Sequence, residues 1–89
     1  MVINCKAWIL TVITWDEAEL AADCINANCP IGMIVLSPLA KGGGYNNMIP
    51  YDHSSTLKTI QEIFQITPLL RHAADPEVRD LSDLFNTFP

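Results

Sequence analysis

Two adjacent carboxylates, Asp16 and Glu17, follow directly after an apolar stretch and are the strongest candidates for chemistry in this sequence. Neighbouring negative charges repel one another, so such a pair is unfavourable unless a cation or hydrogen-bond donors neutralise it. Hard divalent cations prefer oxygen ligands of this kind. The pair is therefore a candidate metal site, and the alternative is that two acidic residues simply open a solvated loop.

A second candidate is His53, which lies in the segment Tyr51–Ser55 just before the clearest helical pattern. A helix N-terminus carries partial positive charge and free amide groups that suit a phosphate or another anion. An imidazole placed there could give a proton or a hydrogen bond to a phosphoryl oxygen. The alternative is that the segment only caps the helix.

Other patterns point to chemistry more weakly. The glycine triplet 42–44 is not followed by Lys and Ser or Thr, so it predicts a flexible loop rather than a phosphate-binding loop. The three cysteines, Cys5, Cys24 and Cys29, are an odd number and exclude a fully paired disulfide framework within one chain. Cys24 and Cys29 could form a loop disulfide, remain thiols or contribute to a metal site.

The composition excludes several classes of protein. The chain has 89 residues, a net charge of 5 − 10 = −5 and 49% apolar residues. Its five Lys and Arg residues are dispersed, which argues against nucleic-acid binding. The apolar content is too high for a disordered chain, and no apolar run is long enough to span a bilayer.

The chain is also unusually apolar for its length. Only 17% of the residues are charged, against about 25% in typical globular proteins. Small domains have proportionally more surface, so we expect part of the apolar surface to be covered by further chain or by a partner. The apolar run 7–13 is followed by Trp15, Asp16 and Glu17 rather than small residues, so it does not resemble a signal peptide.

The elements that must position these residues follow from local patterns. Residues 7–14 and 31–36 are short apolar runs, typical of strands buried on both faces in a parallel sheet. In such α/β sheets, ligand sites lie beyond the carboxyl ends of strands, where Asp16 and Glu17 stand. Helical spacing predicts one main helix with Ser54 or Ser55 as its N-cap, ending at Thr67-Pro68.

Four segments, taken in order, resemble a known family. Residues 12–17, 33–42, 51–64 and 81–85 are similar to the carboxyl-terminal part of the phosphoesterase family, in the alkaline phosphatase superfamily. This family includes bacterial acid phosphatases, phosphatidylinositol-3-phosphatase-like enzymes and non-haemolytic phospholipases C. The resemblance covers roughly residues 8–88, and the acid-phosphatase branch fits better than the phospholipase branch.

The resemblance implies a partial α/β/α sandwich, with two buried strands, one main helix and long loops. It implies a metal-dependent hydrolase that acts on a phosphate-ester substrate, with Asp16 and Glu17 as ligands of a divalent cation. It places His53 on the active-site side, as a weaker candidate. Members of the family are often secreted or periplasmic.

The sequence departs from the family in one large respect. The amino-terminal region of the family carries the nucleophilic serine or threonine and another metal-binding motif, and neither has a counterpart in these 89 residues. We therefore expect residues 1–89 to be a single carboxyl-terminal fragment that is inactive without the missing part. The alternative is a small non-catalytic binding or assembly protein that pairs with another chain, or with itself, through an exposed sheet edge.

Overall fold

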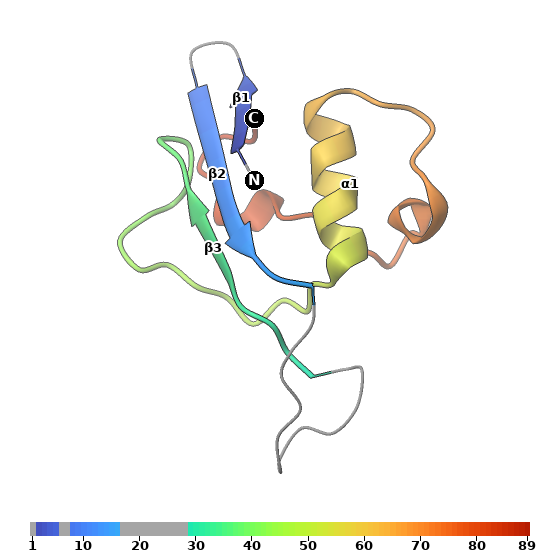
Figure 1. Ribbon diagram of the computed structural model, residues 1–89, viewed down its shortest axis with the longest axis horizontal. Helices are drawn as coiled ribbons and strands as arrows, with labels where there is room; N and C mark the ends of the chain where they lie inside the picture. Colours follow the sequence, from blue (N-terminus) through green and yellow to red (C-terminus); the bar gives the residue numbers. More distant parts are fainter. Residues whose placement is uncertain (1, 6–7, 17–28) are drawn as a thin grey trace. The chain divides into compact units, whose positions relative to one another are not determined.

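A computed structural model of the chain describes residues 2–5, 8–16 and 29–89. The chain divides into two units, Met1–Pro38 and Leu39–Pro89, and each is described by itself. The described residues of the first unit contain three strands, and the second unit contains one α-helix and two 3₁₀ turns (Figure 1). Their bounds are β1 (Val2–Cys5), β2 (Trp8–Thr14), β3 (Met33–Leu36), α1 (His53–Ile63), η1 (Arg71–Ala74) and η2 (Ser82–Leu84).

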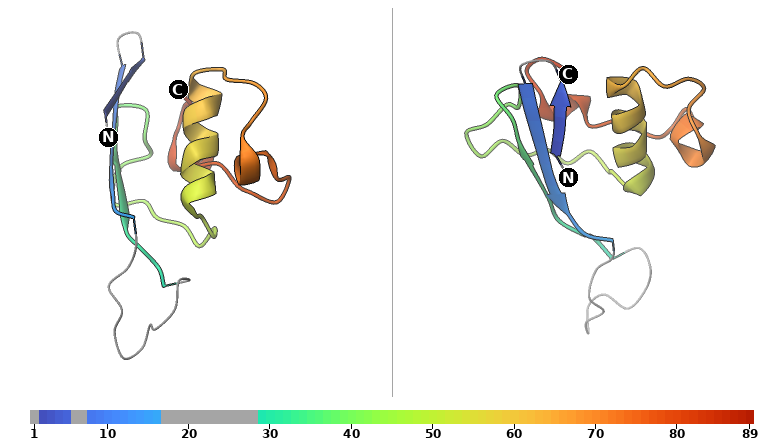
Figure 2. Two further views of the ribbon diagram at one scale, coloured as in Figure 1. Left: turned by 45° about the vertical axis from the view of Figure 1, so that its right-hand side comes forward. Right: turned by 45° about the horizontal axis from the view of Figure 1, so that its top comes forward.

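The strands of the first unit form one antiparallel sheet in the order β1-β2-β3, with β2 in the middle (Figure 2). Val2 lies opposite Thr11 across the first pair, and Thr14 lies opposite Met33 across the second. The β-branched composition of β2 and β3 favours extended backbone. Both predicted strands are therefore confirmed, but the predicted parallel pairing is wrong.

Burial alternates along β2, so the strand is not covered on both faces as expected. Leu10 and Val12 are buried, whereas Ile9 and Ile13 are about half exposed. Successive side chains of a strand point to opposite faces, and an antiparallel sheet tolerates one exposed face. Ile34 lies opposite Ile13 on β3 and is also about half exposed. The continuous apolar run in the sequence therefore corresponds to a strand that is apolar on both faces, one buried and the other exposed.

The helix of the second unit is confirmed, but its N-cap is Asp52 rather than Ser54 or Ser55. Asp52 has extended backbone, and its carboxylate accepts a hydrogen bond from the Ser55 amide. The helix also ends before the predicted stop at Pro68. Phe64 is its C-cap, and Gln65 then takes a positive φ of 55° from which no regular helix continues.

The second unit buries polar as well as apolar side chains. Its buried apolar residues are Ile63, Ala73, Leu81 and Phe85, and its buried polar residues are Ser55, Thr59 and Gln61. η1 packs against α1. No helix in the described part of the chain combines the length and the apolar character that crossing a membrane requires.

Candidate functional site

Asp16 lies at a bend two residues after β2 and is exposed to solvent. The residues before it are held against Gly32. The Thr14 hydroxyl donates a 2.8 Å hydrogen bond to the Gly32 carbonyl, and a Cβ added at Gly32 would come within 2.6 Å of the Trp15 ring. The backbone that leads to Asp16 can therefore take this path only because Gly32 has no side chain. Glu17, the other predicted metal ligand, lies outside the described residues.

The antiparallel pairing removes one sequence argument for this site. In a parallel sheet the carboxyl ends of neighbouring strands share one edge, and their loops converge there. Here the carboxyl end of β2 lies beside the amino end of β3, because Thr14 pairs with Met33. The metal-ligand interpretation of Asp16 and Glu17 thus depends on their chemistry and on the family resemblance.

The donor chemistry fits a divalent cation only in part. Carboxylate oxygens are suitable ligands, but a site for Ca²⁺ or Mg²⁺ needs about six or more of them. Among residues 2–5, 8–16 and 29–89, no group of three His, Cys, Asp or Glu side chains is arranged to hold a metal ion. Two carboxylates alone are therefore too few ligands for such a cation.

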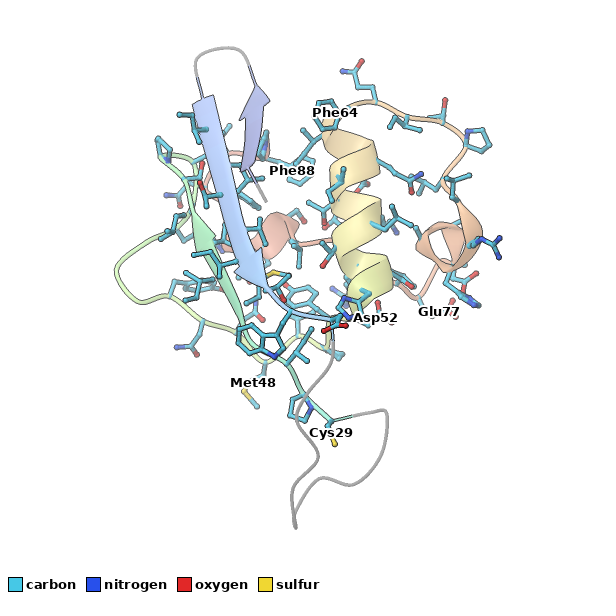
Figure 3. The ribbon with its side chains drawn as sticks, viewed as in Figure 1. Cys29, Met48, Asp52, Phe64, Glu77 and Phe88 are labelled. Carbon is cyan, nitrogen blue, oxygen red and sulfur yellow. The ribbon has the colours of Figure 1, made fainter. Side chains whose placement is uncertain are left out.

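The N-terminus of α1 is occupied by the protein's own carboxylate. Asp52 Oδ1 accepts hydrogen bonds from the Ser55 amide at 2.9 Å and from the Ser55 hydroxyl at 3.3 Å. The Ser55 hydroxyl in turn accepts one from the Asp52 amide at 3.1 Å. Figure 3 labels Asp52 at this end of the helix. This capping box uses one of the amides that an anion would need and places a negative charge beside the rest.

His53 is the first residue of α1 and is exposed, next to the capping aspartate. Asp16 belongs to the first unit and His53 to the second, and each is placed within its own unit. The catalytic role of His53 stays a prediction from the resemblance.

Removal of the cap should weaken α1. We expect Asp52→Ala to lower the free energy of unfolding by about 1 kcal/mol, because the Ser55 amide loses its side-chain acceptor. Asp52→Asn keeps a side-chain oxygen at this position and should cost much less. Urea denaturation followed by far-ultraviolet circular dichroism measures both variants. An equal loss of unfolding free energy in the two variants would contradict the capping role of Asp52.

Asp83 is the centre of a polar cluster that was not predicted from the sequence. Its carboxylate accepts hydrogen bonds from the Tyr45 hydroxyl at 2.6 Å, from Asn47 Nδ2 at 2.7 Å and from Lys41 Nζ at 3.3 Å. The Lys41 ammonium also lies 4.5 Å from the centroid of the Tyr45 ring. These contacts bind both ends of the glycine triplet to η2, although the three glycines themselves take left-handed backbone with φ of 58–74°.

These contacts shift the pKa values of Asp83 and Tyr45. The hydrogen bonds from Tyr45 and Asn47, with a contribution from Lys41, hold the pKa of Asp83 below its ordinary value. The same hydrogen bond to Asp83 raises the pKa of Tyr45. This cluster was hard to predict from sequence, because Asp83 lies 36–42 positions from its three partners and the four residues match no motif.

Loss of the Asp83 carboxylate should release the segment 41–47. We expect Asp83→Ala to speed tryptic cleavage after Lys41, since three side chains lose their common acceptor. Because the pKa of Asp83 is lowered in the fold, its contribution is present above the ordinary value of 3.8 and is lost as the pH falls through the lowered value. Asp83→Asn should therefore remove that acid-dependent loss.

The control is cleavage after Arg79, which lies outside the cluster and is exposed. The ratio of cleavage after Lys41 to cleavage after Arg79 should rise in Asp83→Ala. An unchanged ratio would show that Asp83 does not hold this segment.

Cys29 takes part in a disulfide. Cys24, the partner considered in the sequence analysis, lies outside the described residues. The disulfide agrees with the bridged alternative for Cys29 and argues against a free thiol or a metal thiolate at this position.

Comparison with known protein families gives a match over most of the chain. The model of the Phosphoesterase family matches residues 6–67, which is more than half of the 89 residues. No curated protein and no solved structure matches the chain. The matched range contains β2, β3 and α1, together with Asp16, Glu17 and His53. Three of the four resembling segments lie inside this range, and residues 81–85 lie beyond it.

Proposed function

Because this chain belongs to the phosphoesterase family, we propose that it is part of a metal-dependent hydrolase of phosphate esters, of the acid-phosphatase type. The family assignment itself supports phosphate-ester hydrolysis in general terms. The single observation behind the proposal is that the matched range covers the strand end with Asp16 and Glu17 and the helix start with His53.

In this proposal Asp16 and Glu17 each give carboxylate oxygens to one divalent cation. Such a cation, when bound, would withdraw charge from the phosphoryl group and so favour attack on phosphorus. The exposure of Asp16 leaves its carboxylate accessible to a cation from solvent. The contacts of Thr14 and Trp15 with Gly32 fix the backbone that presents it.

His53 is proposed to give a hydrogen bond or a proton to a phosphate oxygen. Its position at the first turn of α1 supports this role, because the helix dipole there favours negative charge. The Asp52 carboxylate opposes that effect, so the helix start alone would bind phosphate weakly.

The residues here are proposed to be the carboxyl-terminal part of an α/β/α sandwich. No counterpart of the family's nucleophile region occurs among the 89 residues. Hydrolysis through a hydroxyl nucleophile needs that group in line with the phosphorus atom. We therefore propose that the chain has no activity by itself and becomes part of an active site only with the missing region.

The proposal is tested in two steps with the complete 89-residue chain. Titration with Mn²⁺, followed by water-proton relaxation, should detect weak binding that is lost in Asp16→Asn/Glu17→Gln. Glu77→Gln, an exposed control, should bind like the parent chain. Equal Mn²⁺ binding by the double variant and the parent would contradict the ligand assignment.

The second step measures turnover of p-nitrophenyl phosphate. The chain alone should show none, and addition of the amino-terminal part of a phosphoesterase family enzyme should restore it. Asp16→Asn/Glu17→Gln should then lower turnover by at least about tenfold. Turnover by the isolated chain, equally fast in the double variant, would contradict both the residue roles and the proposed incompleteness.

A second candidate function is self-assembly without catalysis. Ile9, Ile13, Ile34 and Leu36 share one face of the sheet and are each about half exposed. Among the described strands, β3 pairs only with β2, so its other edge is open. β2 and β3 contain no charged residue, so face and edge are complementary to those of a second copy.

Sedimentation velocity over a range of concentrations separates the candidates. If the chain self-assembles, Ile34→Lys should shift it toward monomer, because an ammonium would be buried in the contact. Leu57→Lys is the matched control, since Leu57 is an exposed apolar residue of α1. A chain that stays monomeric at every concentration would eliminate this candidate.

A further inference from the structure

Three side chains of α1 hold the segment 78–82, which follows η1 along the chain. Lys58 Nζ donates a 2.8 Å hydrogen bond to the Val78 carbonyl. The Thr59 hydroxyl accepts one from the Leu81 amide at 2.9 Å. One turn further along the helix, the carboxyl group of Glu62 lies within hydrogen-bond reach of the carboxyl group of Asp80.

This last contact requires a proton. Two ionised carboxylates have only acceptors and repel one another, whereas a carboxylic acid can donate to a carboxylate. Glu62 Oε1 is buried and has no hydrogen-bond partner among the described residues, so a negative charge on Glu62 would be poorly compensated. Asp80 Oδ1, in contrast, accepts the Ser82 amide at 3.0 Å. The charge therefore belongs on Asp80 and the proton on Glu62.

We propose that Glu62 and Asp80 share one proton and thereby act as a pH-sensitive contact between α1 and the segment 78–82, which is closed in mild acid and loosened at neutral pH. The other two contacts, from Lys58 and Thr59, involve no carboxyl group. Loosening is therefore local to the carboxyl pair and its neighbours, and does not need the whole unit to unfold.

The charges around the pair agree with this assignment. Burial, followed by the hydrogen bond with Asp80, raises the pKa of Glu62, and Lys58 partly opposes the change. Burial also pushes the pKa of Asp80 upward, but hydrogen bonds from Ser82 and Glu62, with the charge of Lys58, outweigh it and lower the pKa. The charged residues of η1, which also packs on α1, are Arg71 and His72, and neither contributes to these two shifts.

The direction of the pH effect follows from the two shifts. A carboxyl group whose pKa is raised in the fold stabilises it fully below its ordinary value, here 4.5, and this stabilisation is lost as the pH rises through the raised value. Asp80 has a lowered pKa, so its contribution is lost only in stronger acid, below its ordinary value of 3.8. The contact is therefore most stable in mild acid.

The experiment compares the parent chain with Glu62→Gln, in which a neutral amide donates to Asp80 at every pH. Amide hydrogen exchange of Leu81 and Ser82, corrected for the intrinsic pH dependence, reports opening of the segment. In the parent, protection should fall as the pH rises from the ordinary Glu62 value of 4.5 through the raised one, by about tenfold for each unit by which the Glu62 pKa is raised. In Glu62→Gln it should stay constant across this range.

Glu77→Gln is the control, because it removes the same charge from an exposed position nearby, labelled in Figure 3. It should keep the pH dependence of the parent. The proposal is overturned if Glu62→Gln retains that dependence, or if Glu77→Gln abolishes it.

A direct titration covers the case in which Glu62→Gln fails to fold. Carbon-13 resonances of the Glu62 and Asp80 carboxyl groups in the parent chain should titrate separately, with Glu62 last to ionise. Titration of Glu62 at or below its ordinary value would also overturn the proposal.

Discussion

Leu81→Ala should be among the most destabilising single substitutions in this chain, with a loss of about 2–5 kcal/mol in the free energy of unfolding. Leu81 is only 2% exposed and directly precedes η2. The substitution removes buried methyl groups and leaves a cavity that neighbouring side chains fill only in part. For a chain of 89 residues, this is a large share of a total stability of about 5–10 kcal/mol.

Urea denaturation measured by circular dichroism gives the change, as a lower transition midpoint at a similar slope. Leu70→Ala is the matched control, because it deletes the same atoms from a side chain that is 55% exposed. It should shift the midpoint little. Equal shifts in the two variants would mean that Leu81 is not part of a packed core.

Local patterns were sufficient to predict the elements but not the way they pair. β2, β3 and α1 stand where the apolar runs and the helical spacing placed them. β1 was missed, because Lys6-Ala7, the residues between it and β2, are not the types that mark a hairpin turn. Whether two strands run parallel depends on residues far apart in sequence, and a connection as long as the one between β2 and β3 permits either direction.

The helix shows why burial was harder to predict than helicity. Leu57, Ile63 and Phe64 recur at helical spacing, yet Leu57 and Phe64 are exposed and Ile63 is buried. The helix instead buries Ser55 and Thr59, one turn apart, together with Ile63. Polar residues can be buried where the backbone of another segment supplies their hydrogen-bond partners, and that segment, 78–82, lies about 20 residues away.

For the candidate site, only the residue types and their places at the ends of elements could be predicted from the sequence. Asp16 and His53 are at a strand end and a helix start, as expected, and both are exposed. The capping role of Asp52 could have been read from its spacing to Ser55, since a capping box needs a side-chain acceptor and an N3 partner. The carboxyl pair of Glu62 and Asp80 had no such signal, because it arises from tertiary packing.

Thr59→Val should test whether the buried hydroxyl, rather than the shape of the side chain, holds the segment 78–82 on α1. The Thr59 hydroxyl is buried, donates to the Ser55 carbonyl at 2.8 Å and accepts from the Leu81 amide at 2.9 Å. Valine has nearly the same volume but leaves the buried Leu81 amide without an acceptor. We expect a loss of about 1–3 kcal/mol in the free energy of unfolding.

Thr59→Ser separates the two contributions, because it keeps the hydroxyl and removes only a methyl group. If the hydrogen bond to Leu81 dominates, Thr59→Ser should be closer to the parent chain than Thr59→Val, both in unfolding and in amide exchange at Leu81. The reverse order would mean that methyl packing dominates. The Leu81 amide would then be satisfied by water when the hydroxyl is lost, and the segment 78–82 would depend mainly on the apolar contacts of Leu81 itself.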